Sequence, residues 1–129
     1  MSSTLFTPYK LGPVTLRNRT IRSAAFESMG KDFGPTRQLK DYHVAVARGG
    51  VGMTTLAYAA VCRSGLSFNK QLWLRPEIVP GLREITDAVH REGAAAAIQI
   101  GHCGNMTHWT TAGQMPIGAS TGFNLYAYT

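Results

Sequence analysis

The stretch Ala94–Gly104, AAAAIQIGHCG, constrains the fold of this chain more than any other part of its sequence. Residues 94–98 are continuously apolar, contain no Pro, and follow the helix-stop pair Glu92-Gly93. A half-exposed strand would alternate apolar and polar residues, so this run predicts a parallel strand that is covered on both faces. From Gln99 onward the composition changes, and every residue up to Gly104 except Ile100 is glycine or carries a hydrogen-bonding group. Because parallel strands bind ligands at their carboxyl ends, the stretch predicts a ligand site.

Two βα connections precede this strand. Thr36 is a good N-cap for a helix that runs to Arg48 and stops at a Gly pair, and a second helix is expected from Leu82 to Glu92. A β-hairpin is expected first, over residues 5–16 with its turn at Gly12-Pro13. Three strands, near 20–24, 51–57 and 94–100, then alternate with these two helices. A long loop, 104–129, follows the last strand. Strands that alternate with helices predict right-handed crossovers and a parallel sheet, hence an α/β fold.

The composition excludes several classes of protein. With 44% hydrophobic and 16% charged residues, the 129-residue chain is expected to be an ordinary soluble globular domain. The net charge of +6 favours an anionic partner, but the 13 Lys and Arg residues are scattered singly, so no nucleic-acid patch is expected. No segment has the pattern of a secretion signal or a membrane span, so we expect no membrane partner and a cytoplasmic protein. Cys62 and Cys103 are accordingly expected to be reduced thiols.

Four strings in this order resemble the amino-terminal part of the old yellow enzyme family. They are LFTPYKLGPVTLRNR, RSAAFESM, ARGGVGMTTLAYAAV and VPGLREITDAVHREGAAAAIQIGHCG. Members of that family are FMN-dependent NAD(P)H oxidoreductases and ene-reductases built on a TIM barrel, and the string from Ser23 to Ser28 is most similar to the dienoyl-reductase-like branch. The resemblance implies an incomplete TIM (β/α)8 barrel over residues 1–129, made of an amino-terminal β-hairpin and about three βα units, with hydride transfer from NAD(P)H to the flavin and on to an activated alkene.

The resemblance also implies which residues bind the cofactor. Gln99, whose amide can both donate and accept a hydrogen bond, matches the residue that binds the pyrimidine edge of the flavin. Tyr58 matches a flavin contact at the end of the second strand. The segment whose backbone lies against the flavin is matched by Ser23, Ala24, Ala25 and Phe26. Phe26 departs from the Thr or Cys that many members carry, and it has no group that can donate a hydrogen bond to tune the flavin.

No residue of the chain matches the family's substrate-binding pair, its tyrosine proton donor or its phosphate loops. We therefore expect no catalytic residue here, and a need for a complementary polypeptide or self-association. The alternative is a non-catalytic or regulatory partial-barrel subunit. A polyanion-binding module, based on the charge, is a weaker possibility.

Other polar residues have structural explanations. His102 is expected to be a structural histidine, because no carboxylate lies near it in the sequence. The spacing of His102, Cys103 and His108 fits no standard zinc pattern, so no metal is expected. His43 and His90 are expected to be partly exposed on helices. Glu27 and Asp32 are expected to be solvated.

Overall fold

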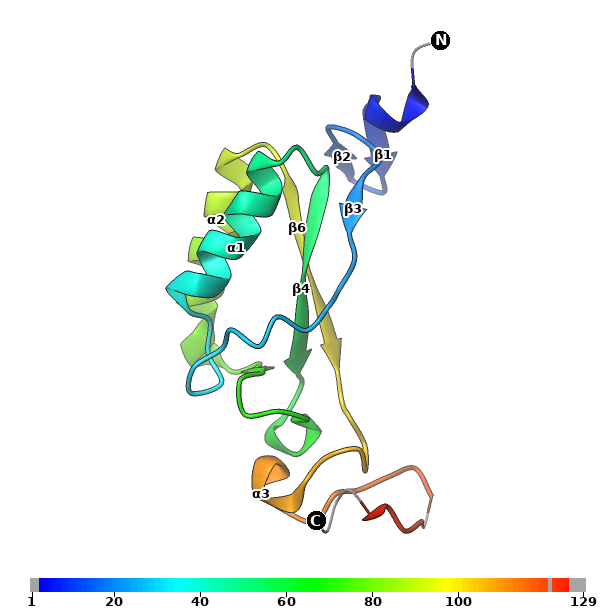
Figure 1. The fold of residues 1–129 in the computed structure, drawn as a ribbon, viewed down its shortest axis with the longest axis vertical. Helices are drawn as coiled ribbons and strands as arrows, with labels where there is room; N and C mark the ends of the chain where they lie inside the picture. Colours follow the sequence, from blue (N-terminus) through cyan, green and yellow to red (C-terminus); the bar gives the residue numbers. More distant parts are fainter. Residues whose placement is uncertain (1–2, 121, 126–129) are drawn as a thin grey trace.

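The computed structural model describes residues 3–120 and 122–125. Its main sheet is parallel, with β4 in the middle: β4 pairs with β3 and β5 on one side and with β6 on the other. The register places Met53 of β4 beside Ile21 and beside Ala95. The strands are β3 (Ile21–Arg22), β4 (Met53–Ala60), β5 (Leu72–Trp73) and β6 (Ala95–Gly101). Figure 1 shows β4 and β6 running side by side with the same direction.

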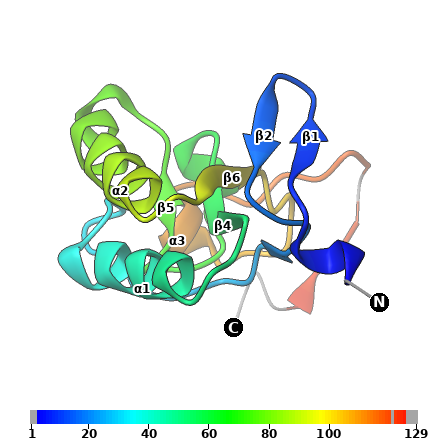
Figure 2. The same cartoon turned by 90° about the horizontal axis from the view of Figure 1, so that it is seen from above.

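Helices α1 (Arg37–Arg48) and α2 (Val79–Arg91) cover one face of this sheet, as Figure 2 shows from above. The N-cap prediction for α1 is confirmed, because Thr36 Oγ1 accepts a hydrogen bond from Leu39 N at 3.2 Å. Helix α2 begins three residues earlier than expected, with Pro80 in its first turn. Apolar residues of the two helices and the sheet form the core: Leu39, Ala47, Leu56, Ala59, Leu72, Ile85, Val89 and Ala94.

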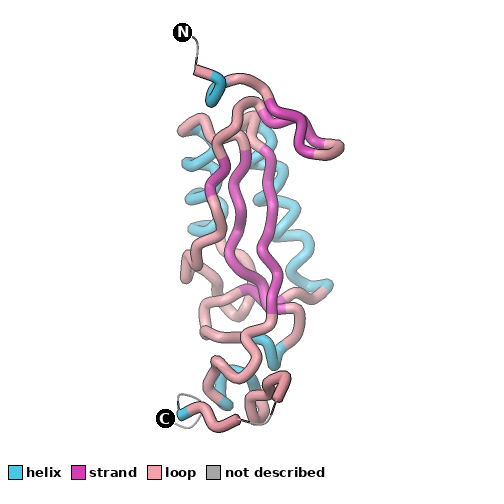
Figure 3. The backbone as a smooth tube through the Cα atoms, turned by 90° about the vertical axis from the view of Figure 1, so that its right-hand side faces the viewer, coloured by secondary structure: helices cyan, strands magenta, loops and turns pink. Residues whose placement is uncertain are grey.

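The other face of the sheet is not covered by any helix of the described residues, and Figure 3 shows it turned toward the viewer with both helices behind. The prediction that the strand after Glu92 is covered on both faces is therefore wrong. Residues 98–100 of β6 are exposed, with Ile100 at 58%. In the described part of the chain β6 pairs with β4 alone, so its outer edge has no strand beside it.

The β-hairpin is shorter than expected and consists of β1 (Tyr9–Leu11) and β2 (Val14–Leu16), because a 3₁₀ turn, η1 (Thr4–Phe6), precedes it. It lies at the amino-terminal end of β4 and β6 (Figure 1). Arg17, which follows it, donates to the Val51 carbonyl at 3.0 Å, to the Glu92 carbonyl at 2.8 Å and to the Ala47 carbonyl. One guanidinium thus ties the hairpin to the ends of both helices and to the start of β4.

The opposite, carboxyl-terminal end of the strands carries the irregular segments. The connection from β4 to α2 contains η2 (Arg63–Gly65), β5 and η3 (Pro76–Ile78). After β6, the expected loop contains one helical turn, α3 (Trp109–Ala112), and is otherwise irregular as far as it is described; its positions 121 and 126–129 lie outside the described residues. None of the described helices combines the length and apolar character that a membrane span needs.

Candidate functional site

Gln99 lies near the carboxyl end of β6 with its side chain exposed. Ala96 of the same strand packs against the core between the sheet and the helices, and successive strand residues point to opposite faces, so Ala96 and Ile98 face the helices. The Gln99 amide therefore points to the face that no described helix covers. It has no hydrogen-bond partner among the described residues, so both its donor and its acceptor are available to a ligand.

The small residues after β3 leave the sheet instead of continuing the strand. Ser23 and Ala25 are exposed, and Ala24 is half-buried. Their backbone N–H groups have no hydrogen-bond partner within the described residues. Since Ala side chains do not hinder a close approach, a flat ligand can reach this backbone.

Phe26 and Tyr58 meet near the carboxyl end of β4, the strand to which Tyr58 belongs. Their ring centroids are 6.1 Å apart in an edge-to-face arrangement, and the Phe26 ring stacks on Phe68 at 4.7 Å. The Tyr58 hydroxyl donates to Ser67 Oγ at 2.5 Å. An apolar cavity of about 460 Å³ lies beside this aromatic cluster and is lined by Tyr58, Ser67, Phe68, Cys103 and Met106. The cluster thus places two of the predicted site residues in contact. Tyr58 also lies on the strand next to Gln99, since both fall between the register pairs Leu56↔Ile98 and Ala59↔Ile100.

Glu27, expected to be solvated, is buried: its side chain is 3% exposed. Glu27 Oε1 lies 2.9 Å from Arg22 Nη1, and Oε2 accepts from Ala57 N at 3.1 Å. The prediction was wrong because Arg22, five residues earlier, and the backbone of β4 supply the partners that water would otherwise supply.

His43 is also fully buried, so the expectation that it is partly exposed is wrong as well. Its Nε2 lies 3.3 Å from Glu27 Oε1, and its Nδ1 lies 2.8 Å from Thr54 Oγ1. The signal was present in the sequence, since His43 follows Leu39 by four residues and shares its face of the helix. His90, in contrast, is exposed.

His102, expected to be a structural histidine, makes two polar contacts at the end of β6. Its Nδ1 accepts from Gly104 N at 2.9 Å and its Nε2 lies 3.2 Å from Ser64 Oγ, which ties the end of β6 to η2. A Cβ on Gly65 would lie 2.9 Å from His102 Cδ2, so only glycine allows the imidazole to pack there. Among the described residues no group of three His, Cys, Asp or Glu side chains could hold a metal ion.

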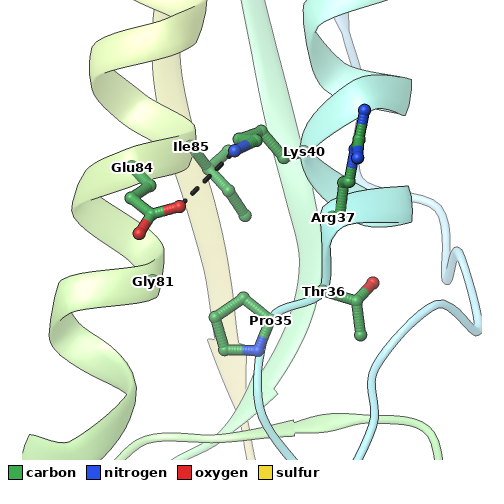
Figure 4. Close-up of a pocket in the computed structure, with 7 residues that line it drawn as sticks. All are labelled: Pro35, Thr36, Arg37, Lys40, Gly81, Glu84 and Ile85. Atoms are coloured by element: carbon green, nitrogen blue, oxygen red, sulfur yellow. Dashed lines mark hydrogen bonds and ion pairs between the residues drawn. The ribbon is translucent and has the colours of Figure 1, made fainter.

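A second cavity, of about 240 Å³, lies between the first turns of α1 and α2 on the outer side of the helices (Figure 4). Lys40 reaches across it to Glu84 Oε2 at 3.4 Å, and Pro35 packs against Gly81, where a Cβ would lie 2.6 Å from Pro35 Cγ. The cavity is on the helix side of the sheet, away from the face that carries Gln99.

Comparison with known proteins identifies the family. Residues 4–127 match the model of the NADH:flavin oxidoreductase / NADH oxidase family. The chain belongs to this family. Its sequence is 48% identical over 100 residues to the 4,4'-dithiodibutanoate disulfide reductase of Rhodococcus erythropolis, covering 78% of this chain and 25% of that protein. It is 38% identical over 106 residues to the NADPH dehydrogenase of Listeria welshimeri, covering 79% of this chain and 31% of that one.

The fold agrees with that of solved members of the flavin oxidoreductase family. The old yellow enzyme homologue from Zymomonas mobilis superposes with a TM-score of 0.84 at 24% identity, over 93% of this chain and 34% of that one. The α/β elements thus correspond to part of a TIM barrel. The chain spans about a quarter to a third of the length of these three proteins.

Family membership implies FMN as cofactor with NAD(P)H as reductant, and the described residues fit such a group. An unpartnered Gln99 amide and the unpartnered backbone N–H groups of residues 23–25 suit the polar atoms of an isoalloxazine ring. The small side chains of this segment suit its flat face. All of them lie toward the carboxyl-terminal half of the sheet, where barrels of this kind bind their ligands.

Proposed function

We propose that this chain forms one side of the FMN site of an NAD(P)H-dependent oxidoreductase. The observation that carries the proposal is the free Gln99 amide on the uncovered face of the sheet, in a chain of the flavin oxidoreductase family. Bound FMN supplies the hydride chemistry, and the protein positions the cofactor and tunes it.

The proposed roles follow the chemistry of each residue. Gln99 hydrogen-bonds the pyrimidine edge of the flavin, and the backbone of Ser23–Ala25 lies against the ring system. Phe26 and Tyr58 present an apolar wall, which the 6.1 Å contact between their rings keeps in place. Phe26 has no hydrogen-bond donor, so it cannot tune the flavin by the hydrogen bond that a Thr or Cys would provide.

In this proposal, residues 1–129 are the hairpin and first three βα units of the barrel, and a complementary polypeptide or a second copy supplies the remaining strands. Two features support it. The outer edge of β6 has no partner strand among the described residues, and an apolar hollow of about 260 Å³ lies beside it, lined by residues of β4, α2 and β6 that include Leu82 and Ile98.

The substrate is proposed from the family and from one relative. An activated alkene is the substrate class of the old yellow enzyme group. A linear disulfide is the second candidate, favoured by the 48% identity to the dithiodibutanoate disulfide reductase. Assays with cyclohexenone and with 4,4'-dithiodibutanoate, each with NADH and with NADPH, separate the two classes.

The test is to co-express the tagged chain with the polypeptide encoded beside it and to measure bound FMN and NAD(P)H oxidation. We expect a yellow complex with turnover and, from the chain purified alone, neither. A tagged chain that never holds FMN in any assembly would exclude the proposal and favour a non-catalytic subunit.

A further inference from the structure

Strand β3 is only two residues long, and its early end leaves part of the edge of β4 without a neighbour. The two strands pair through Ile21↔Met53 and Arg22↔Thr54. Met53 N donates to the Thr20 carbonyl on this edge. Alternate residues of a strand expose their backbone groups to the same edge, so the polar groups of Thr55 and Ala57 face the same way.

Two side chains take the place of the missing strand. Arg22 Nη1 donates to the Thr55 carbonyl at 2.7 Å, and Glu27 Oε2 accepts from Ala57 N at 3.1 Å. The same two side chains are paired with each other at 2.9 Å. An ion pair therefore replaces the neighbouring strand along this edge of β4. The Arg22 guanidinium takes the place of a backbone N–H as donor, and the Glu27 carboxylate takes the place of a backbone carbonyl as acceptor.

The ion pair is largely enclosed by neighbouring residues. The side chains are 16% and 3% exposed. His43 of α1 lies 3.3 Å from Glu27 Oε1, and the Arg22 guanidinium lies over the ring of Tyr42 at 5.0 Å from its centroid. A pair with so little contact with water is weakly screened by salt, and removal of either partner leaves a buried charge.

The contact between Arg22 and Glu27 also fixes the two ends of the four-residue segment that lies between them in the sequence. Arg22 Nη2 donates to the Ala25 carbonyl at 3.2 Å, so both ends and one internal group of the intervening segment are fixed. That segment is Ser23–Phe26. Its N–H groups at 23–25 are left without partners in the described residues, because side chains and not its own backbone complete the sheet.

From these contacts we infer that Arg22 and Glu27 are positioning residues, which set the conformation of Ser23–Phe26 by completing the edge of β4. The functional consequence, that the segment presents its backbone to the flavin, rests on the proposed function. Neither side chain need touch the cofactor to have this effect.

The direct test is hydrogen exchange of the chain in its assembled form, comparing the wild type with Glu27→Gln and Arg22→Lys. In Glu27→Gln the side-chain NH₂ must point either toward Arg22 and His43 or toward the N–H of Ala57. In both arrangements a hydrogen-bond donor of the glutamine faces another donor, Arg22 in the first and Ala57 N–H in the second. We expect exchange at Ala57, whose N–H donates to Glu27, to rise about tenfold, with little change in α2. Glu84→Gln, which removes an exposed partner of Lys40, is the matched control and leaves the pattern unchanged.

The second readout is the cofactor in the FMN-loaded assembly. We expect Glu27→Gln and Arg22→Lys to weaken FMN binding about tenfold and to shift the reduction potential and the visible spectrum, whereas Glu84→Gln changes none of these. Unchanged exchange at Ala57, or raised exchange with an unaltered flavin, overturns the inference. If the wild type holds no FMN, the proposed function fails, and the exchange result alone decides whether the pair sets the segment.

Discussion

The ring of Phe26 stacks on the ring of Phe68, with centroids 4.7 Å apart and 21° between the ring planes. The first residue follows β3 and the second belongs to the connection after β4, so the contact joins two loops at the carboxyl end of the sheet. Buried Gln71 supports the second loop, because its Oε1 accepts from Ser67 N at 2.7 Å.

The stacked pair should stabilise the assembled protein. A double-mutant cycle with Phe26→Leu and Phe68→Leu is expected to give a coupling of about 1 kcal/mol. Denaturant unfolding at fixed protein concentration measures it. A parallel cycle that pairs Phe26→Leu with Phe6→Leu, an exposed residue of the amino-terminal turn, should give no coupling; equal values in both cycles would contradict the prediction.

Gln99→Ala should weaken FMN binding in the assembled protein. Loss of one buried hydrogen bond costs about 1–3 kcal/mol of binding free energy, which flavin fluorescence titration detects readily. Gln114→Ala removes the same functional group from an exposed loop and serves as the control. Equal affinities for the wild type and Gln99→Ala would show that Gln99 does not bind the flavin.

Arg17→Met should destabilise the protein strongly, because three carbonyls at element ends lose a charged donor. We expect a loss of about 3 kcal/mol in the free energy of unfolding. Arg83→Met, on an exposed face of α2, is the matched control. A thermal midpoint that is the same in both variants would mean that Arg17 contributes nothing beyond its charge.

Gly52→Ala should be poorly tolerated, since a Cβ at this position would lie 2.5 Å from the Asn18 carbonyl oxygen. The strand entry would have to move away from Asn18, at a cost of about 1–3 kcal/mol. Gly122→Ala, where a Cβ meets nothing within 4 Å, should be neutral. Circular dichroism melts of the two variants compare them directly.

The isolated chain should associate or aggregate at low micromolar concentration. The exposed residues Ile98 and Ile100 of β6, together with its outer edge, which has no partner strand among the described residues, provide a template for another strand. Sedimentation velocity measures the outcome. A single 14.0 kDa species with cooperative unfolding would show that the edge is satisfied within the chain.

The sequence predicted the parts of the fold whose signals are local. Thr36 as N-cap and the stop at Gly49 are one-residue signals, and they located α1 to the residue. The two-residue strand β5 was missed because it is too short to show a pattern and forms only through its pairing with Ala59 and Ala60. The extent of β6 was nearly right, while its burial was not, because an apolar run does not reveal which segments will cover it.

For a similar reason, the sequence predicted the positions of some candidate site residues but not the burial of Glu27 beside them. The positions of Gln99 and Phe26 on the sheet and its loop follow from local patterns and from the family resemblance; their contacts with a flavin stay a prediction. The burial of Glu27 depends on Ala57, thirty residues later, and on His43 of a helix. Such a contact exists only once the crossover has formed, so no spacing in the sequence shows it.

Arg17 connects groups that are far apart in synthesis: its carbonyl acceptors are 30, 34 and 75 residues downstream. During translation the hairpin therefore emerges first, but its docking site is complete only after Glu92 has left the ribosome. The hairpin is made before the sheet and its helices, but it should be fixed in place after them. Pulse-labelling exchange during refolding tests this order, and early protection of the hairpin would refute it.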